Sequence, residues 1–266
     1  MSETASSFTV IDGAVSVVPH LELLKRAGVT SVMRYLNPLG PSQKQASEGE
    51  ASAVASSGLS LGLVSEGWGD FAHGGVSAAA GERDGEHALV CAPRLGAPDG
   101  ACVYFAVDTD ASEAEVSKLV IPYFASIRAL LSPKFRVGVY GSGLVCSRVL
   151  DAKLADLAWL ACAMGWRESR SFLAGARWAL AQKLPRSVGH FDFDPDDARG
   201  DFGAFRPFQA SATPPAPPAS PFEELLAQAR ELLARGEGAA SALVHDATNG
   251  LHEAVEAALQ AREGSL

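Results

Sequence analysis

Near the middle of the chain lies Ala101-Cys-Val-Tyr-Phe-Ala-Val-Asp-Thr-Asp110, an apolar run that ends in two carboxylates. Its β-branched and aromatic residues, bounded by turn-forming residues on both sides, predict a strand that is buried on both faces. Residues two apart on a strand point the same way, so Asp108 and Asp110 are expected to project together from its polar end. Paired carboxylates in one cleft are what acid and base chemistry on a glycosidic bond requires.

Similar apolar runs alternate with helix-like segments on both sides of this strand. Further strands are predicted at 8–12, 29–35, 59–64, 136–141, 157–162, 177–182 and 190–194, and helices at 21–26, 47–56, 75–91, 113–131 and 145–150. Eight strands alternating with helices across about 200 residues favour an α/β fold of the (β/α)8 TIM-barrel type. A doubly wound open sheet is the rival, but no glycine-rich phosphate loop of the Rossmann or P-loop kind follows any predicted strand.

Polar residues gather at the carboxyl ends of these strands, which meet at one face of a barrel and carry the active site there. The catalytic candidates are Asp108, Asp110, Glu66 and Asp12, and the candidates for substrate binding are Arg34, Tyr35, Tyr140, Trp159, Gln182, Asp192 and Asp194. The aromatic rings among them suit stacking on a sugar, because a pyranose presents an apolar face to a ring.

Each acid also has a plausible structural role. Asp108 could form an ion pair with Arg34, and Asp110 could cap the helix that begins near Ser112. If Asp110 only caps a helix, Glu66 is the remaining long carboxylic acid at a strand end. The segment Asp194-Pro-Asp-Asp197 could be a turn rather than part of the cleft.

Composition excludes several classes of partner. The 266 residues carry a formal net charge of −9, with no cluster of Lys and Arg, which disfavours nucleic acid and anionic membranes. The four cysteines lack metal-binding spacing and are expected to be reduced thiols in the core. The histidines are dispersed and indicate no metal site, and no cofactor is implied. A minor alternative is that several of the acids converge to bind Ca²⁺ or Mg²⁺. The N-terminal residues do not resemble a signal peptide, so we expect the chain to be cytoplasmic as synthesised, with delivery outside by a particle or by lysis left open.

A proline-rich segment marks the end of the predicted barrel domain at residue 208. Residues 209–221 are expected to form a linker, and residues 222–266 an amphipathic helical tail with eight acids against three bases. The apolar seam of the tail is expected to pack either on its own barrel or on a protein partner.

Six short motifs in order resemble those of a known family. They are Ile11-Asp12-Gly13, Arg34-Tyr35-Leu36, Gly58-Leu59, the strand end at 104–110, Gly138-Val-Tyr-Gly141 and Phe191-Asp-Phe-Asp194. Over about residues 8–205 the chain resembles the glycoside-hydrolase-like barrel family called domain of unknown function 1906, which is similar to the family 25 lysozyme-like muramidases.

The resemblance implies roles for particular residues. The muramidases carry Asp-x-Glu at the end of the fourth strand, and here Asp110 stands at the position of their general acid, one methylene shorter. The first strand contributes Asp12. The leading hypothesis is hydrolysis of a bacterial cell-wall polysaccharide such as peptidoglycan. Asp108 is expected to be the nucleophile or electrostatic stabiliser and Asp110 or Glu66 the acid, while Arg34 and Tyr35 position the sugar. The alternative is a glycan-binding or structural module without chemistry, attached through its tail to a larger assembly such as a phage-like particle.

Overall fold

The computed structural model of the chain describes residues 9–36, 44–67, 71, 74–188 and 190–207. The predicted linker at 209–221, the predicted tail at 222–266 and Trp68 lie outside the described residues, so the domain boundary at 208 stays a prediction. Among the described residues there is no helix with the length and apolar character needed to cross a membrane.

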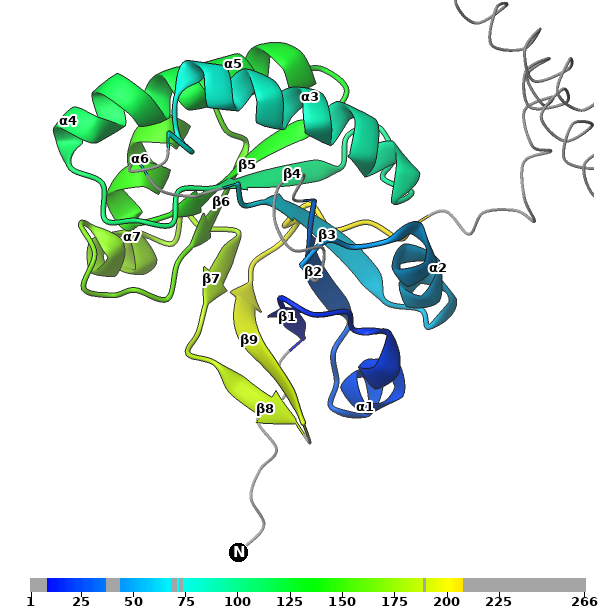
Figure 1. The fold of residues 1–266 in the computed structure, drawn as a ribbon. Helices are drawn as coiled ribbons and strands as arrows, with labels where there is room; N and C mark the ends of the chain where they lie inside the picture. Colours follow the sequence, from blue (N-terminus) through cyan, green and yellow to red (C-terminus); the bar gives the residue numbers. More distant parts are fainter. Residues whose placement is uncertain (1–8, 37–43, 68–70, 72–73, 189, 208–266) are drawn as a thin grey trace, which may run out of the picture. The chain divides into compact units, whose positions relative to one another are not determined.

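A closed ring of strands forms the centre of the molecule (Figure 1). Seven strands are parallel neighbours in chain order: β1 (Val10–Asp12), β2 (Ser31–Tyr35), β3 (Ser60–Ser65), β4 (Cys102–Ala106), β5 (Arg136–Gly141), β6 (Leu157–Leu160) and β7 (Leu180–Gln182). The eighth position is taken by β9 (Phe191–Ala198), which pairs with both β7 and β1. The short strand β8 (Arg186–Val188) pairs with β9 outside the ring.

The direction of the last strand corrects the predicted all-parallel (β/α)8 barrel. β9 runs antiparallel to β7 and to β1, so the described part of the chain forms a mixed barrel of eight strands. A parallel connection needs a dozen or more residues to cross back over the sheet, and residues 183–190 are too few. The chain instead reverses through the β8–β9 hairpin, and the strand predicted at 190–194 extends through Pro195 to Ala198.

Helices connect the parallel strands and pack on the outside of the ring (Figure 1). They are a 3₁₀ turn (Val18–His20), α1 (Leu21–Arg26), α2 (Glu48–Ser56), α3 (Ala78–Arg94), α4 (Glu113–Glu115), a π-helical turn (Val116–Val120), α5 (Ile121–Leu131), α6 (Gly143–Asp151) and α7 (Ser169–Gly175). α3 and α5 pack so closely that a Cβ at Gly81 would lie 2.2 Å from the carbonyl oxygen of Tyr123, so this position requires glycine.

Alternation along the strands creates two apolar layers. Residues that face outward, such as Ile11, Val103 and Phe105, pack against the helices. Residues that face inward fill the barrel, and they are Val10, Met33, Val64, Cys102, Tyr104, Ala106, Trp159 and Leu180. The inner layer is a packed core, so an open space arises only above it, where the inward-facing residues become polar.

Candidate active site

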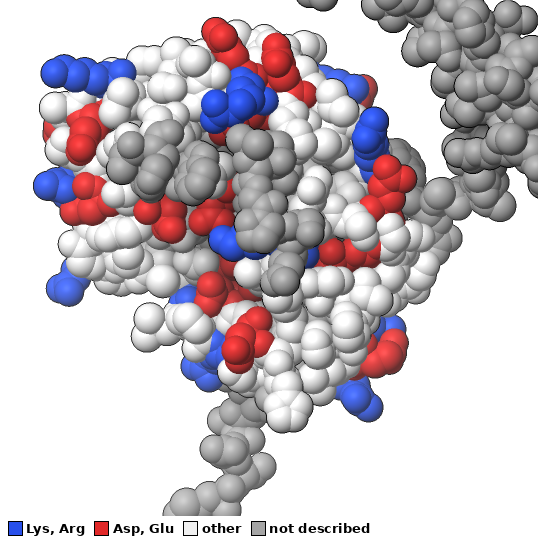
Figure 2. All heavy atoms as spheres, in the orientation of Figure 1, with Lys and Arg blue, Asp and Glu red and all other residues white. Residues whose placement is uncertain are grey.

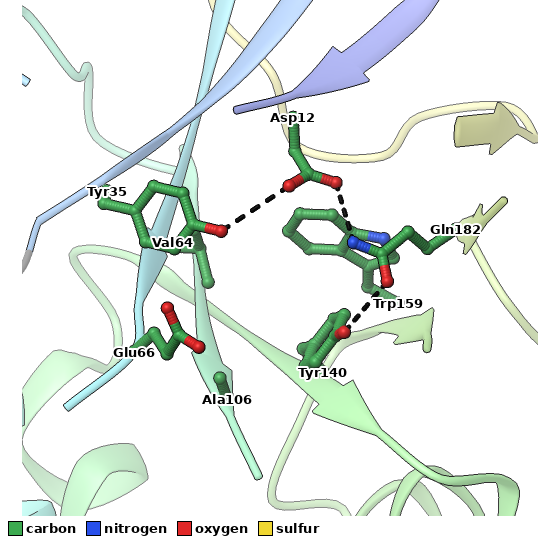
Figure 3. A pocket seen from close by; sticks show the side chains of 8 residues that line it. All are labelled: Asp12, Tyr35, Val64, Glu66, Ala106, Tyr140, Trp159 and Gln182. Atoms are coloured by element: carbon green, nitrogen blue, oxygen red, sulfur yellow. Dashed lines mark hydrogen bonds between the residues drawn. The ribbon is translucent and has the colours of Figure 1, made fainter. Parts of the chain in front are cut away.

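A pocket lies at the end of the barrel where strands β1 to β7 finish. It is lined by Asp12, Tyr35, Val64, Glu66, Ala106, Tyr140, Trp159 and Gln182 (Figure 3). These side chains come from all seven parallel strands or the residues that follow them directly, and the polar ones lie above the apolar interior. The free space is about 30 Å³, which is room for very few water molecules. In the orientation of Figure 1, acidic side chains also gather across the middle of the molecular face (Figure 2).

Asp12 is the most deeply placed acid of the pocket, with 2% of its surface exposed. Its Oδ2 accepts a hydrogen bond from Gln182 at 2.9 Å, and its Oδ1 lies 3.5 Å from the hydroxyl of Tyr35. Burial, acting against the Gln182 hydrogen bond and together with the charges of Asp194 and Glu66, raises the pKa of Asp12 to about 7. Asp12 therefore exchanges a proton near neutral pH.

Gln182 connects both sides of the pocket through one amide group. Its nitrogen donates to Asp12 Oδ2 at 2.9 Å and to Asp194 Oδ2 at 3.4 Å. Its oxygen accepts from the Tyr140 hydroxyl at 2.9 Å and from the backbone N–H of Cys162 at 3.4 Å. Because a backbone N–H can only donate, the Cys162 contact fixes which end of the amide faces the two acids.

Two further acids stand around Asp12. Glu66 follows β3 and forms an ion pair with Lys44 at 2.9 Å. Asp194 lies on β9 directly opposite Asp12 in the strand register, and burial raises the pKa of its carboxyl group. The antiparallel direction of β9 produces this pairing, since it brings the first half of the strand to the same end of the barrel as the tips of β1 and β7.

Asp108 lies at the edge of the pocket, after the end of β4. Its side chain is exposed, yet partial burial raises its pKa while the charge of Lys44 lowers it. Its own charge contributes to the raised pKa of Tyr140, which places the carboxylate close to the pocket wall. Asp108 thus remains available to a ligand that approaches along β4.

The structure corrects the prediction that Arg34 contacts a substrate or pairs with Asp108. Arg34 points out of the barrel, is fully buried, and binds Glu50 of α2 through Nε at 2.8 Å and a terminal nitrogen at 3.3 Å. Its other terminal nitrogen donates to the carbonyl of Gly13. Inward-facing Met33 and Tyr35 flank it on β2, so alternation forces the guanidinium to the outside.

Asp110 is also placed away from the pocket, which corrects its predicted role as the proton donor. Its carboxylate accepts from the guanidinium of Arg167 at 2.7 Å and from the backbone N–H of Arg167 at 2.8 Å. The alternative role as a helix cap is not realised either. Ser112 caps α4 itself and forms a reciprocal pair of hydrogen bonds with Glu115.

Two other predicted binding residues have different surroundings from those expected. Asp192 is exposed on the β8–β9 hairpin, where its carboxylate accepts a hydrogen bond from Ser187. Trp159 is 1% exposed and lies at the bottom of the pocket, with its ring edge-on to Tyr140 at a centroid distance of 5.0 Å. Its indole closes the base of the cavity rather than offering a wide stacking face.

Sequence reasoning missed Asp196, which is buried inside the barrel beneath the pocket. The signal was present, because Asp192, Asp194 and Asp196 occupy alternate positions and so share one face of the strand. Pro195 made the segment look like a turn. In the structure Pro195 lies within β9 opposite Ile11, so the strand and its alternation continue through it.

Comparison with known proteins places this chain in a family. The model of the Rv2525c-like, glycoside hydrolase-like domain matches residues 22–204. The chain belongs to this family. The resemblance inferred from the six motifs to a glycoside-hydrolase-like barrel family is thereby confirmed.

Several known proteins are similar to this chain, and the chain spans only a small part of the first curated relative. The uncharacterized protein YbfG of Bacillus subtilis is 34% identical over 118 residues, which are 41% of this chain but only 16% of YbfG. The crystal structure of the Tat-secreted protein Rv2525c of Mycobacterium tuberculosis, solved with HEPES and with L-tartrate, has a TM-score of 0.65 and 21% identity over 75% of this chain and 99% of that one. The crystal structure of the CTP1L endolysin has a TM-score of 0.51 and 14% identity, and the match covers 71% of this chain and 66% of the endolysin chain. The two solved structures show that the fold is shared.

Among the described residues of this Rv2525c-like domain, the acids do not gather as a metal site. Within the described ranges there is no group of three or more His, Cys, Asp or Glu side chains that could hold a metal ion. Asp110 and Asp192, two of the five acids considered for Ca²⁺ or Mg²⁺, are engaged with Arg167 and Ser187 outside the pocket.

Proposed function

We propose that the pocket is the active site of a glycoside hydrolase that cleaves a bacterial cell-wall polysaccharide such as peptidoglycan, as a muramidase does. The observation that carries the proposal is the convergence of Asp12 and Glu66 on one cavity, with Asp194 opposite Asp12 in the strand register and the pKa of Asp12 raised to about 7. A carboxylic acid that holds its proton near neutral pH beside ionised carboxylates is the arrangement that glycosidases use.

The roles follow from the positions of the side chains. Asp12 is the general acid that protonates the glycosidic oxygen, because its proton is retained up to about pH 7. Asp108 is the nucleophile or the carboxylate that stabilises the positive charge of the sugar, and Glu66 is the second candidate for the acid. Tyr35, Tyr140 and Gln182 hold hydroxyl groups of the sugar. Membership of a glycoside hydrolase-like family and the fold shared with an endolysin support this proposal.

The test is release of reducing sugar from purified peptidoglycan by the full chain between pH 5 and 8. Asp12→Asn should lower the rate by about 100-fold or more, because the substitution removes the proton that is transferred. Asp151→Asn is the matched control, since Asp151 is exposed on α6 and pairs with Arg177. In the unsubstituted protein the rate should fall above about pH 7, where Asp12 loses its proton. Full turnover by Asp12→Asn would contradict the proposal.

The small volume of the pocket favours a second candidate, a glycan-binding or structural module without chemistry. Only about 30 Å³ is free, because the Gln182 side chain bridges Asp12 and Tyr140 across the space. This candidate predicts that the full chain sediments with the same peptidoglycan preparation while releasing no reducing sugar. Sedimentation with turnover would support the hydrolase instead.

A further inference from the structure

Asp196 lies in the barrel interior, one layer below the acids of the pocket. On β9 it is two residues beyond Asp194 and faces the same way, and in the strand register it stands opposite Val10 of β1 and Gln182 of β7. Only 3% of its surface is exposed. The side chain is therefore shielded from water by the pocket residues above it.

The two oxygens of Asp196 have different surroundings. Oδ1 accepts a hydrogen bond from the indole Nε1–H of Trp159 at 2.6 Å. Oδ2 is buried and has no hydrogen-bond partner among the described residues. An ionised carboxylate in this place would leave one charged oxygen unsolvated, whereas a carboxylic acid with its proton on Oδ2 carries no such charge.

The ionisable groups around Asp196 also disfavour a negative charge. Asp12 stands on β1, Asp194 and Asp197 on β9 itself, and the hydroxyl-bearing Tyr104 on β4. Burial raises the pKa of Asp196 well above its usual range, the charges of the three carboxylates raise it further, and the Trp159 bond opposes them.

We propose that Asp196 is a positioning residue that acts as a neutral carboxylic acid. Its Oδ1 fixes the indole of Trp159 at the base of the pocket. Its Oδ2 keeps a proton, so that no further negative charge lies beneath Asp12. Trp159 in turn packs against Tyr140, which binds Gln182, so the orientation of the indole affects the amide that contacts Asp12. The link to catalysis rests on the proposed function, but the protonation of Asp196 does not.

The test compares the unfolding equilibrium constants of the full chain and of Asp196→Asn between pH 4 and 8. The unfolded chain loses this proton above about pH 4, while the folded barrel keeps it. The unfolding constant of the unsubstituted protein, divided by that of Asp196→Asn, should therefore rise about tenfold per pH unit above pH 4. The same ratio for the surface control Asp151→Asn should stay flat. A flat ratio for Asp196→Asn between pH 5 and 7 would show that Asp196 is ionised in the folded state and would overturn the inference.

A second measurement covers the case in which Asp196→Asn does not fold. The carboxyl carbons of aspartate can be labelled and followed by NMR in the unsubstituted full chain. The carboxyl carbon assigned to Asp196 should still report a protonated acid at pH 8, where Asp12 is mostly ionised, and an ionised Asp196 at that pH would contradict the proposal.

Turnover of peptidoglycan separates this inference from the proposed function. Asp196→Asn keeps an acceptor for the indole and should stay within about twofold of the unsubstituted rate, whereas Asp196→Leu removes the acceptor and should lose about tenfold or more. If no form of the protein has turnover while the pH-dependent ratio holds, the hydrolase proposal fails and the protonation of Asp196 stands.

Discussion

At the scale of single residues, Gln182 determines how the pocket acids behave. One amide group makes four contacts, two with carboxylates and two with donors on the opposite side. It lowers the pKa of Asp12 against the larger effect of burial. The Gln182 side chain therefore helps to keep the pKa of Asp12 near neutral, in addition to filling space in the pocket.

Gln182→Leu should raise the pKa of Asp12 above its value of about 7, because the ionised form loses its hydrogen-bond donor. A donor to a charged oxygen contributes about 1.5 to 3 kcal/mol, so the shift should be about one pH unit or more. Titration of the Asp12 carboxyl carbon by NMR measures it. Tyr35→Phe is the comparison and should shift the midpoint less, because its bond to Asp12 is long at 3.5 Å. An unchanged midpoint in Gln182→Leu would contradict the role assigned to the amide.

At the scale of elements, the ion pair of Arg34 and Glu50 ties β2 to α2. Glu50 also accepts the backbone N–H of Val17, and Arg34 donates to the carbonyl of Gly13. The pair therefore holds the loop after β1, which follows the catalytic candidate Asp12. Its contribution to the site is the placement of backbone, not contact with a ligand.

Arg34→Met should cost about 3 to 5 kcal/mol of unfolding free energy, because it leaves the carboxylate of Glu50 buried without its cation. Adding Glu50→Gln should cost less than the sum of the two single changes, since the unpaired charge is gone. Chemical denaturation of the four proteins measures this coupling. Arg177→Met, which breaks an exposed pair with Asp151, should cost at most about 1 kcal/mol. Additive effects of the two core substitutions would contradict the pairing.

At the scale of the whole molecule, the barrel interior packs closely because a large ring on one strand lies over a glycine on the next. Tyr104 of β4 lies over Gly138 of β5, and its hydroxyl donates to the carbonyl of Phe202 at 2.8 Å. The ring of Tyr104 packs edge-on to Trp159 at 5.6 Å. Gly138 supplies the space that this arrangement needs.

Gly138→Ala should destabilise the protein by about 1 to 3 kcal/mol, because a Cβ there would lie 2.4 Å from the Tyr104 ring in a packed interior. Thermal unfolding measures the loss. Gly165→Ala is the matched control, since no atom lies within 4 Å of a Cβ at that position. Equal melting temperatures for the two variants would show that the interior can absorb the methyl group.

The sequence alone predicted most of the strand positions and the polarity of their ends. Alternation is a local property, so inward-facing Asp12 and Tyr35 could be recognised from their neighbours. The same rule could have excluded Arg34 and found Asp196. At these two positions, however, a charged residue at a strand end and a proline within a strand both suggest other interpretations.

Pairing across the barrel was decided only by the tertiary structure. Arg34 meets Glu50, Asp110 meets Arg167 and Asp12 meets Gln182, the last two partners being separated by 170 positions in the chain. The antiparallel β9, which sets Asp194 beside Asp12, also depends on how the ring closes. Local patterns determine to which face of its own strand a side chain points. The partner of that side chain depends on packing between distant segments, and this packing sets both the burial and the pKa of the acids.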